Sequence, residues 1–90
     1  MLYVVIERFR GGDALPVYRR LRDRGRQIAP GLQYHGSWVS QDFTRCWQVM
    51  ECADPQLLSQ WMATWSDLVE FEVVPVNTSA EAVAAITPRL

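Results

Sequence analysis

The sequence contains no apolar run long enough to cross a membrane. Its longest apolar run has only about five residues, whereas a membrane-spanning helix needs roughly 20. The apolar start of the chain is interrupted at once by Glu7 and Arg8, and it lacks the basic leader and long apolar core of a signal peptide. We therefore expect a cytoplasmic protein that has no membrane partner.

Cysteine and histidine are scarce, with two cysteines and one histidine among the 90 residues. Cys46 and Cys52 lie in a segment typical of a strand, roughly 20 Å apart at about 3.3 Å per residue. A disulfide needs Cα atoms within about 7 Å, so we predict two free, buried thiols. The set is too small for a zinc site, and we expect no metal and no cofactor. A haem would depend on His35 as its only imidazole ligand.

Lysine is absent, so all nine basic residues are arginines, and eight of them lie in the first 45 residues. The net charge is −1, which disfavours nucleic-acid binding. Five arginines cluster between residues 19 and 26, but no aromatic or glycine-rich element is interleaved with them. We expect no nucleic-acid partner. The cluster is either a solvated helix face or an anion-binding patch.

The chain has the length of one small domain, whose stability would be marginal alone, so a partner subunit is plausible. Apolar alternation predicts strands over 2–9, 32–39, 45–52 and 69–76. Helical spacing predicts one helix from about Asp13 to Ile28 and another that begins at Pro55 after an Asp54 cap. Thr78 and Glu81 have capping-box spacing before a short helix. We therefore divide the chain into a domain over 1–78 and a terminal helix or tail over 79–90, which is either loose or an arm onto a second subunit.

The order strand, helix, strand, strand, helix, strand is that of the ferredoxin-like arrangement. It predicts an α+β protein in which two helices cover one face of a four-stranded antiparallel sheet, with the first and third strands at the centre. We assign Leu2, Val4, Ile6, Trp47 and Val49 to the helix-covered face. The same assignment adds Leu32, Tyr34, Trp38, Val69, Phe71 and Val73 to that face.

The opposite face then carries the alternate residues of each strand, which mix large apolar groups with an amide, carboxylates and the single imidazole. They are Tyr3, Val5, Glu7, Phe9, Gln33, His35, Ser37, Cys46, Gln48, Met50, Cys52, Glu70 and Glu72. Such a face is too apolar to be left in water. We predict that a second copy packs on it, sheet to sheet, to form a homodimeric α+β barrel with a cavity between the sheets. A register slip of one residue would exchange Tyr34 and Trp38 for His35.

Several stretches resemble a bacterial family known as domain of unknown function 3303. They are Val5–Phe9, Val17–Arg20, Arg24–Arg26, Ser37–Val39, Gln48–Glu51 and Asp67–Val76, so that the resemblance extends over nearly the whole chain. It implies a ferredoxin-like dimeric barrel, but it brings no agreed activity and no catalytic residue. Dimeric barrels include cofactor-free monooxygenases, isomerases and haem-degrading enzymes, and this link is an analogy of fold.

We expect a small apolar or carbonyl-containing ligand on the open face, bound by Tyr3, Phe9, Gln48 and Met50. One alternative is a cofactor-independent monooxygenase or isomerase. Glu7 would then be the base, its pKa raised by apolar neighbours, and His35 the acid, with Tyr3 donating to an oxyanion. The other alternative is a structural or regulatory homodimer without a cavity.

Overall fold

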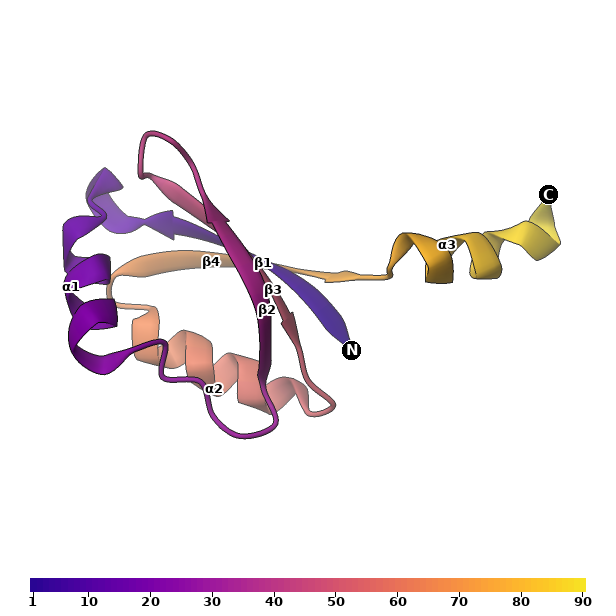
Figure 1. Cartoon of the computed structure of the whole chain (residues 1–90), viewed down its shortest axis with the longest axis horizontal. Helices are drawn as coiled ribbons and strands as arrows, with labels where there is room; N and C mark the ends of the chain where they lie inside the picture. Colours follow the sequence, from indigo (N-terminus) through magenta and orange to yellow (C-terminus); the bar gives the residue numbers. More distant parts are fainter.

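The computed structural model describes all residues from 1 to 90. Its main elements are β1 (Leu2–Phe9), α1 (Leu15–Arg24), β2 (Gln33–Val39), β3 (Arg45–Glu51), α2 (Pro55–Trp65), β4 (Val69–Val76) and α3 (Ser79–Ile86), with short 3₁₀ turns at Arg10–Gly12 and Thr87–Arg89. The sheet is antiparallel, with strand order β2-β3-β1-β4. α1 and α2 cover the same face of it (Figure 1). The predicted ferredoxin-like α+β fold is confirmed.

The first helix is shorter than predicted because Gly25 ends it. Asp13 accepts a hydrogen bond from the amide of Leu15 at 3.0 Å, so its side chain serves the first turn of α1 as expected. The helix stops at Arg24, four residues before the predicted end at Ile28. Gly25 has φ +67° and ψ −164°, a conformation that costs a residue with a Cβ. Arg26 therefore leaves the arginine-rich helix face.

The caps of the other two helices agree with the sequence. Asp54 accepts from the amide of Gln56 at 2.9 Å and precedes Pro55, the first residue of α2. Thr78 and Glu81 form a complete capping box at the start of α3. Each cap satisfies helix amides that have no partner inside the helix, which explains why these two helices begin where they do.

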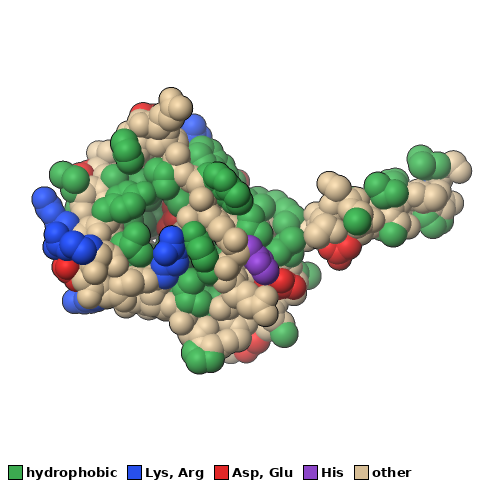
Figure 2. Space-filling model, viewed as in Figure 1, with side chains coloured by type: hydrophobic (Ala, Val, Ile, Leu, Met, Phe, Trp, Pro, Cys, Tyr) green, Lys and Arg blue, Asp and Glu red, His purple; other side chains and the backbone are tan.

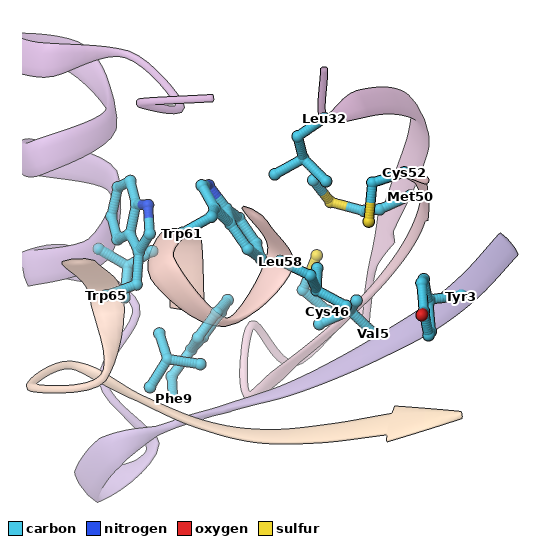
Figure 3. Packing of buried hydrophobic residues seen from close by; sticks show 12 residues of the cluster. Tyr3, Val5, Phe9, Leu32, Cys46, Met50, Cys52, Leu58, Trp61 and Trp65 are labelled. Carbon is cyan, nitrogen blue, oxygen red and sulfur yellow. The ribbon is translucent and has the colours of Figure 1, made fainter. Parts of the chain in front are cut away.

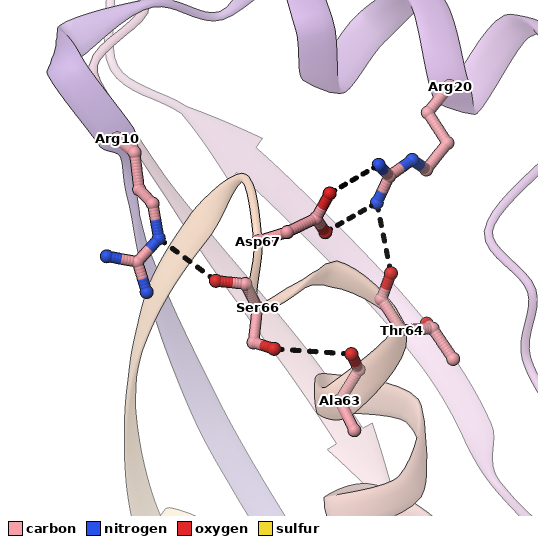
Figure 4. Close-up of polar contacts among 6 residues, drawn as sticks. All are labelled: Arg10, Arg20, Ala63, Thr64, Ser66 and Asp67. Carbon is pink, nitrogen blue, oxygen red and sulfur yellow. Dashed lines mark hydrogen bonds and ion pairs between the residues drawn. The ribbon is translucent and has the colours of Figure 1, made fainter.

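An ion pair ties α1 to the turn that connects α2 with β4 (Figure 4). The guanidinium of Arg20 donates to both carboxylate oxygens of Asp67, at 2.8 and 2.6 Å, and to the carbonyl of Thr64 at 3.0 Å. It also lies 5.5 Å from the ring centre of Trp65. The two hydrogen bonds with Arg20 hold the pKa of Asp67 below its ordinary value. The contact fixes the two helices relative to each other at this end of the sheet.

The faces of the two central strands are opposite to the prediction. Tyr3, Val5, Glu7 and Phe9 of β1 are buried beneath the helices, and Cys46, Gln48 and Met50 of β3 lie on the same face. The assignment of Leu2, Val4, Ile6, Trp47 and Val49 to the helices is therefore wrong. We call the helix-covered face the inner face. The open face carries Leu2, Val4, Ile6, Arg8, Trp38, Arg45, Trp47, Val49, Glu51, Glu70, Glu72 and Val74.

The outer strands were assigned in part correctly. Val69, Phe71 and Val73 of β4 do face the helices, since each is paired with an inner-face residue of β1. On β2 a bulge lies between Tyr34 and Gly36. It interrupts the regular alternation of side chains between the two faces of the sheet. Tyr34 consequently lies on the inner face as predicted, whereas Trp38, paired with Trp47, lies on the open face and is 63% exposed.

The core lies between the inner face and α2 (Figure 3). Helix α1 contributes Val17 to it. Trp61 and Trp65 of α2 pack over the sheet, and the ring of Trp61 lies 5.7 Å from that of Phe71. Both cysteines are free and buried in this core, which confirms the prediction of two thiols. No helix has both the length and the apolar composition that crossing a membrane requires.

Helix α3 projects away from the rest of the molecule as an arm (Figure 1). None of its residues is buried, and its apolar residues Val83 and Ile86 are 62% and 49% exposed. We refer to residues 79–90 as the arm. Its position leaves the helix with no packing surface in its own chain.

Candidate functional site

A pocket opens between the inner face of the sheet and the two helices. It encloses about 510 Å³ of empty space, including the part open to solvent. Its lining is mostly apolar and comprises Glu7, Phe9, Val17, Tyr18, Leu21, Arg26, Ser37, Val39, Cys46, Gln48, Trp61 and Trp65. Figure 2 shows a hollow framed by hydrophobic side chains, with acidic atoms inside it and a basic side chain at its edge. We call this space the inner pocket.

Glu7 is the only acidic group in the lining, and it is 5% exposed. The amide of Gln48 donates a short hydrogen bond to its Oε2 atom. Burial raises the pKa of Glu7, while hydrogen bonds from Gln48 and Cys46 and the positive charge of Arg26 act against this rise. Glu7 is therefore a carboxyl group poised to exchange a proton at a higher pH than an exposed glutamate.

Gln48 can hold Glu7 in either protonation state. With Glu7 ionised, the Gln48 N–H₂ group donates to the carboxylate, as it does in the structure. Its Oε1 atom is buried and has no hydrogen-bond partner. Rotation of the amide by 180° would present this oxygen to a protonated Glu7, because an amide carries donors on one side and an acceptor on the other. The pair can thus accommodate the loss and gain of a proton without leaving a charge unpaired.

Arg26 is the only basic group in the lining, and contacts with three residues fix its position. Its carbonyl accepts from the indole N–H groups of Trp61 at 2.8 Å and Trp65 at 3.3 Å. Its guanidinium lies 4.2 Å from the ring centre of Tyr34 and donates to the Tyr34 hydroxyl at 3.0 Å. The loop after α1 is therefore anchored to both α2 and β2, which places a positive charge beside the pocket.

The bulge in β2 makes the Tyr34 anchor possible. Tyr34 and Ser37 are three residues apart, and residues at that separation lie on opposite faces of a regular strand. The extra residue brings both to the inner face, where their hydroxyl groups are 2.5 Å apart. Ser37 also lines the inner pocket. The bulge thus connects Arg26 to the wall of the pocket through two hydroxyl groups.

Cys46 lines the pocket but is not suited to act as a nucleophile. Burial, followed by the nearby negative charge of Glu7, raises the pKa of its thiol to about 12. The reactive form of cysteine is the thiolate, which such a pKa makes scarce at neutral pH. Tyr18, at the pocket wall with its ring 6.4 Å from that of Phe9, also has a raised pKa, chiefly through burial. Both groups therefore act as hydrogen-bond donors rather than as bases.

The structure brings together some of the residues selected from the sequence. Glu7, Phe9 and Gln48 line the inner pocket, whereas Tyr3 and Met50 are buried in the core outside its lining. The expected position on the open face is wrong for all five, since they lie on the inner face. The error follows from the reversed assignment of β1 and β3.

His35 lies apart from Glu7. Its Nε2 atom is 2.8 Å from Oε1 of Glu51, and both side chains are nearly half exposed. They line a wide, shallow hollow on the open face that continues to Thr78 and Glu81 at the root of the arm. Glu7 and His35 are therefore not positioned to act on one ligand within one chain.

Sequence reasoning missed Arg26, Tyr18, Trp61 and Trp65 as pocket residues. Arg26 was counted with the arginines of the helix face, although Gly25 signals the end of that helix one residue earlier. The two tryptophans were assigned to core packing, which they also do. Only the convergence of α1, α2 and the sheet shows that they enclose a space.

The fold and the pocket define a ferredoxin-like α+β protein with a cavity between its sheet and its helices. The chain belongs to the family described as domain of unknown function, DUF3303, which matches residues 1–90. Among solved structures, the crystal structure of protein Atu4242 from Agrobacterium tumefaciens is similar. It has a TM-score of 0.51 and 16% sequence identity, covering 88% of this chain and 96% of that one. No curated protein matches the sequence.

Proposed function

We propose that this protein binds a small apolar or carbonyl-containing ligand in the inner pocket. The observation that carries the proposal is the position of Glu7, a buried carboxyl group inside a pocket that is mostly apolar and open to solvent. Small-molecule sites commonly combine an apolar lining with a few polar groups that orient the ligand. Glu7, Arg26 and Ser37 supply such groups here.

Burial of a carboxyl group in a small domain is costly unless something compensates for it. Gln48 and Arg26 compensate in part, yet the pKa of Glu7 stays raised by burial. An apolar residue at this position would pack against Phe71 and Val5 at no such cost. The presence of an acid in the core is therefore best explained by a function of the carboxyl group in the pocket.

A blocking variant tests this proposal. Val39→Trp places a large side chain in the inner pocket, whereas Val74→Trp places the same side chain on the open face. We expect native mass spectrometry of freshly purified protein, or thermal shift with a panel of phenols and acetophenones, to reveal a ligand for the wild type and for Val74→Trp. The Val39→Trp variant should lose it. A panel that stabilises none of the three proteins, with no co-purified compound, would show that the proposal is wrong.

A second candidate function is proton transfer next to a carbonyl group, the step shared by cofactor-independent isomerases and monooxygenases. The raised pKa of Glu7 favours it, because a base is most effective when its pKa lies near the working pH. Arg26, the only basic group of the lining, could stabilise the resulting enolate. Exchange of α-protons for deuterium in a bound ketone tests this function. We expect exchange to be lost in Glu7→Gln and kept in His35→Gln, since His35 lies on the open face.

We also propose a homodimer in which a second copy covers the open face. Leu2, Val4, Ile6, Trp47 and Val49 form its half-buried centre, and Trp38 and Val74 are exposed beside them. A face this apolar is uncommon on a monomer. Arg8 and Arg45 also lie directly opposite each other on neighbouring strands, and like charges in such pairs repel. Glu51, at the other end of β3, would approach this arginine pair if two copies packed with their strands reversed.

The arm gives separate support for a second copy. An isolated helix of fewer than about 12 residues is marginal in water, so an eight-residue helix needs a surface to pack on. Its own chain offers none, and the shallow hollow at its root is continuous with the open face. A copy packed on the open face would lie next to the arm and could cover Val83 and Ile86.

A further inference from the structure

We infer that the ligand of the inner pocket is a neutral ring compound whose hydroxyl group, phenolic or enolic, donates a hydrogen bond to Glu7. This inference rests on the proposed function, because it specifies the ligand of that same pocket. It is carried by the chemistry of the lining, in which the polar groups differ in what they can accept, donate and repel.

The ligand needs a hydrogen-bond donor because Glu7 in the pocket is a hydrogen-bond acceptor. An ionised carboxylate only accepts hydrogen bonds, and Glu7 receives one from the protein's Gln48 amide on Oε2. A hydroxyl group is a donor small enough to approach a carboxylate that is only 5% exposed. An ether offers no donor and would leave the carboxylate desolvated without compensation.

The neutrality of the ligand follows from the two charges of the lining. An anionic ligand would be repelled by Glu7, which lies within the apolar part of the pocket. A cationic ligand would suit Glu7 and the aromatic walls, but it would be repelled by Arg26, whose charge is close enough to lower the pKa of Glu7. A neutral donor avoids both repulsions and leaves the attraction between Glu7 and Arg26 intact.

The ring is indicated by the side chains that form the walls of the pocket. The pocket is bordered by the flat side chains of Phe9, Tyr18, Trp61 and Trp65. Flat apolar walls of this kind favour an aromatic ring, because aromatic pairs attract each other beyond the effect of the area they bury. The pocket also opens to solvent, so the rest of the ligand can extend beyond it.

The four tryptophans allow a site-specific test. Trp61 and Trp65 line the inner pocket, and both indole N–H groups bond to the Arg26 carbonyl. Trp38 and Trp47 are paired on the open face and serve as internal references. Nitrogen-15 NMR of the indole groups therefore reports on the two faces separately in one sample.

The experiment compares four compounds of similar shape: 4-methylphenol, its methyl ether 4-methylanisole, 4-methylbenzylamine and 4-methylbenzoate. We expect 4-methylphenol to shift the Trp61 and Trp65 signals saturably, with an affinity at least about tenfold higher than that of the ether, because a hydrogen bond to a charged group is lost in the ether. Equal affinity for the ether, or a preference for the amine or the benzoate, would overturn the inference while leaving ligand binding in the pocket supported. If no compound shifts the two signals, ligand binding in the inner pocket is itself wrong.

Variants at Glu7 complete the test. Glu7→Met keeps the length of the side chain and removes the acceptor, and Glu72→Met makes the same change on the open face as a matched control. We expect Glu7→Met to abolish the preference for 4-methylphenol over 4-methylanisole and Glu72→Met to keep it. Should Glu7→Met fail to fold, Glu7→Gln, which retains a polar group, is expected to reduce the preference. An unchanged preference in a folded Glu7 variant would overturn the inference.

Discussion

Glu7 is the residue in which stability and function are opposed. It lies opposite Cys46 on β3 and Phe71 on β4, beneath the helices, where an ionised carboxylate is poorly solvated. The groups that face it are Gln48 and Cys46 from β3, Tyr18 from α1 and Arg26 from the loop after α1. Of these, only Arg26 is charged at neutral pH. Glu7 therefore destabilises the fold when it is ionised.

The pH dependence of stability follows from this opposition. Since burial raises the pKa of Glu7 above its ordinary value of 4.5, the folded state binds more protons than the unfolded state between that value and the folded pKa. Stability falls as pH rises through this window. Glutamine does not ionise, so this position no longer contributes to the pH dependence in Glu7→Gln. We expect the Tm of Glu7→Gln, relative to that of the wild type, to increase by several degrees between pH 4 and pH 8, since about 1 kcal/mol is equivalent to 4–8 °C. Thermal unfolding at both pH values checks this. A constant difference would contradict the assigned protonation behaviour.

At the scale of the elements, two irregularities build the pocket. Gly25 ends α1 early, and the bulge in β2 brings Tyr34 to the inner face. Together they allow Arg26 to contact Tyr34, Trp61 and Trp65 at once. Regular continuation of either element would carry Arg26 or Tyr34 to another face.

A substitution at Gly25 isolates the first irregularity. The backbone angles of Gly25 fall in a region that costs other residues about 1–3 kcal/mol, so Gly25→Ala should lower Tm and displace the Arg26 carbonyl. We expect the indole signals of Trp61 and Trp65 to shift and those of Trp38 and Trp47 to stay. Arg24→Ala, at the exposed last residue of α1, is the control and should change stability by less than about 0.5 kcal/mol. Unchanged Trp61 and Trp65 signals in Gly25→Ala would show that this turn does not position Arg26.

The elements themselves could be predicted from the sequence, but the orientation of the central strands could not be obtained from apolar alternation. Both faces of β1 and of β3 carry apolar residues, so the period of two fits either orientation. Charge gave a better signal: Arg8, Arg45 and Glu51 all share the open face, whereas Glu7 is the only charge of these two strands on the inner face. The bulge in β2 has no comparable signature, because it depends on how β2 pairs with β3. The inner pocket was predicted only through Glu7, Phe9 and Gln48, since its other walls come from distant segments.

In the whole molecule, the two faces of the sheet have different surroundings. Its inner face and helices enclose the pocket, whereas its open face and the arm remain without a partner in one chain. Because the pocket lies within a single chain, the proposed dimer does not complete it. Ligand binding and self-association are then separable properties.

Sedimentation velocity at micromolar concentration tests the proposed dimer. We expect a dimeric wild type and a monomeric Val49→Arg, because the new charge would lie at the centre of the open face. Gln60→Arg, exposed on α2, should remain dimeric. Val83→Glu on the arm should weaken the dimer by at least about tenfold, an effect that the neighbouring Ala84→Glu should not share. A strictly monomeric wild type would count against both the dimer and the role given to the arm.

The alternation along β1 has a consequence for how this protein can evolve. Tyr3, Val5, Glu7 and Phe9 face the pocket side, while the residues between them face the side given to the partner. Under the two proposals, ligand preference and choice of partner are encoded in alternate codons of the same short stretch. Point mutations can therefore change one property and leave the other, so that a duplicated gene can acquire a new ligand while keeping its partner. A deletion of one codon exchanges the two sets, and we expect natural relatives to differ more often in sequence here than in length.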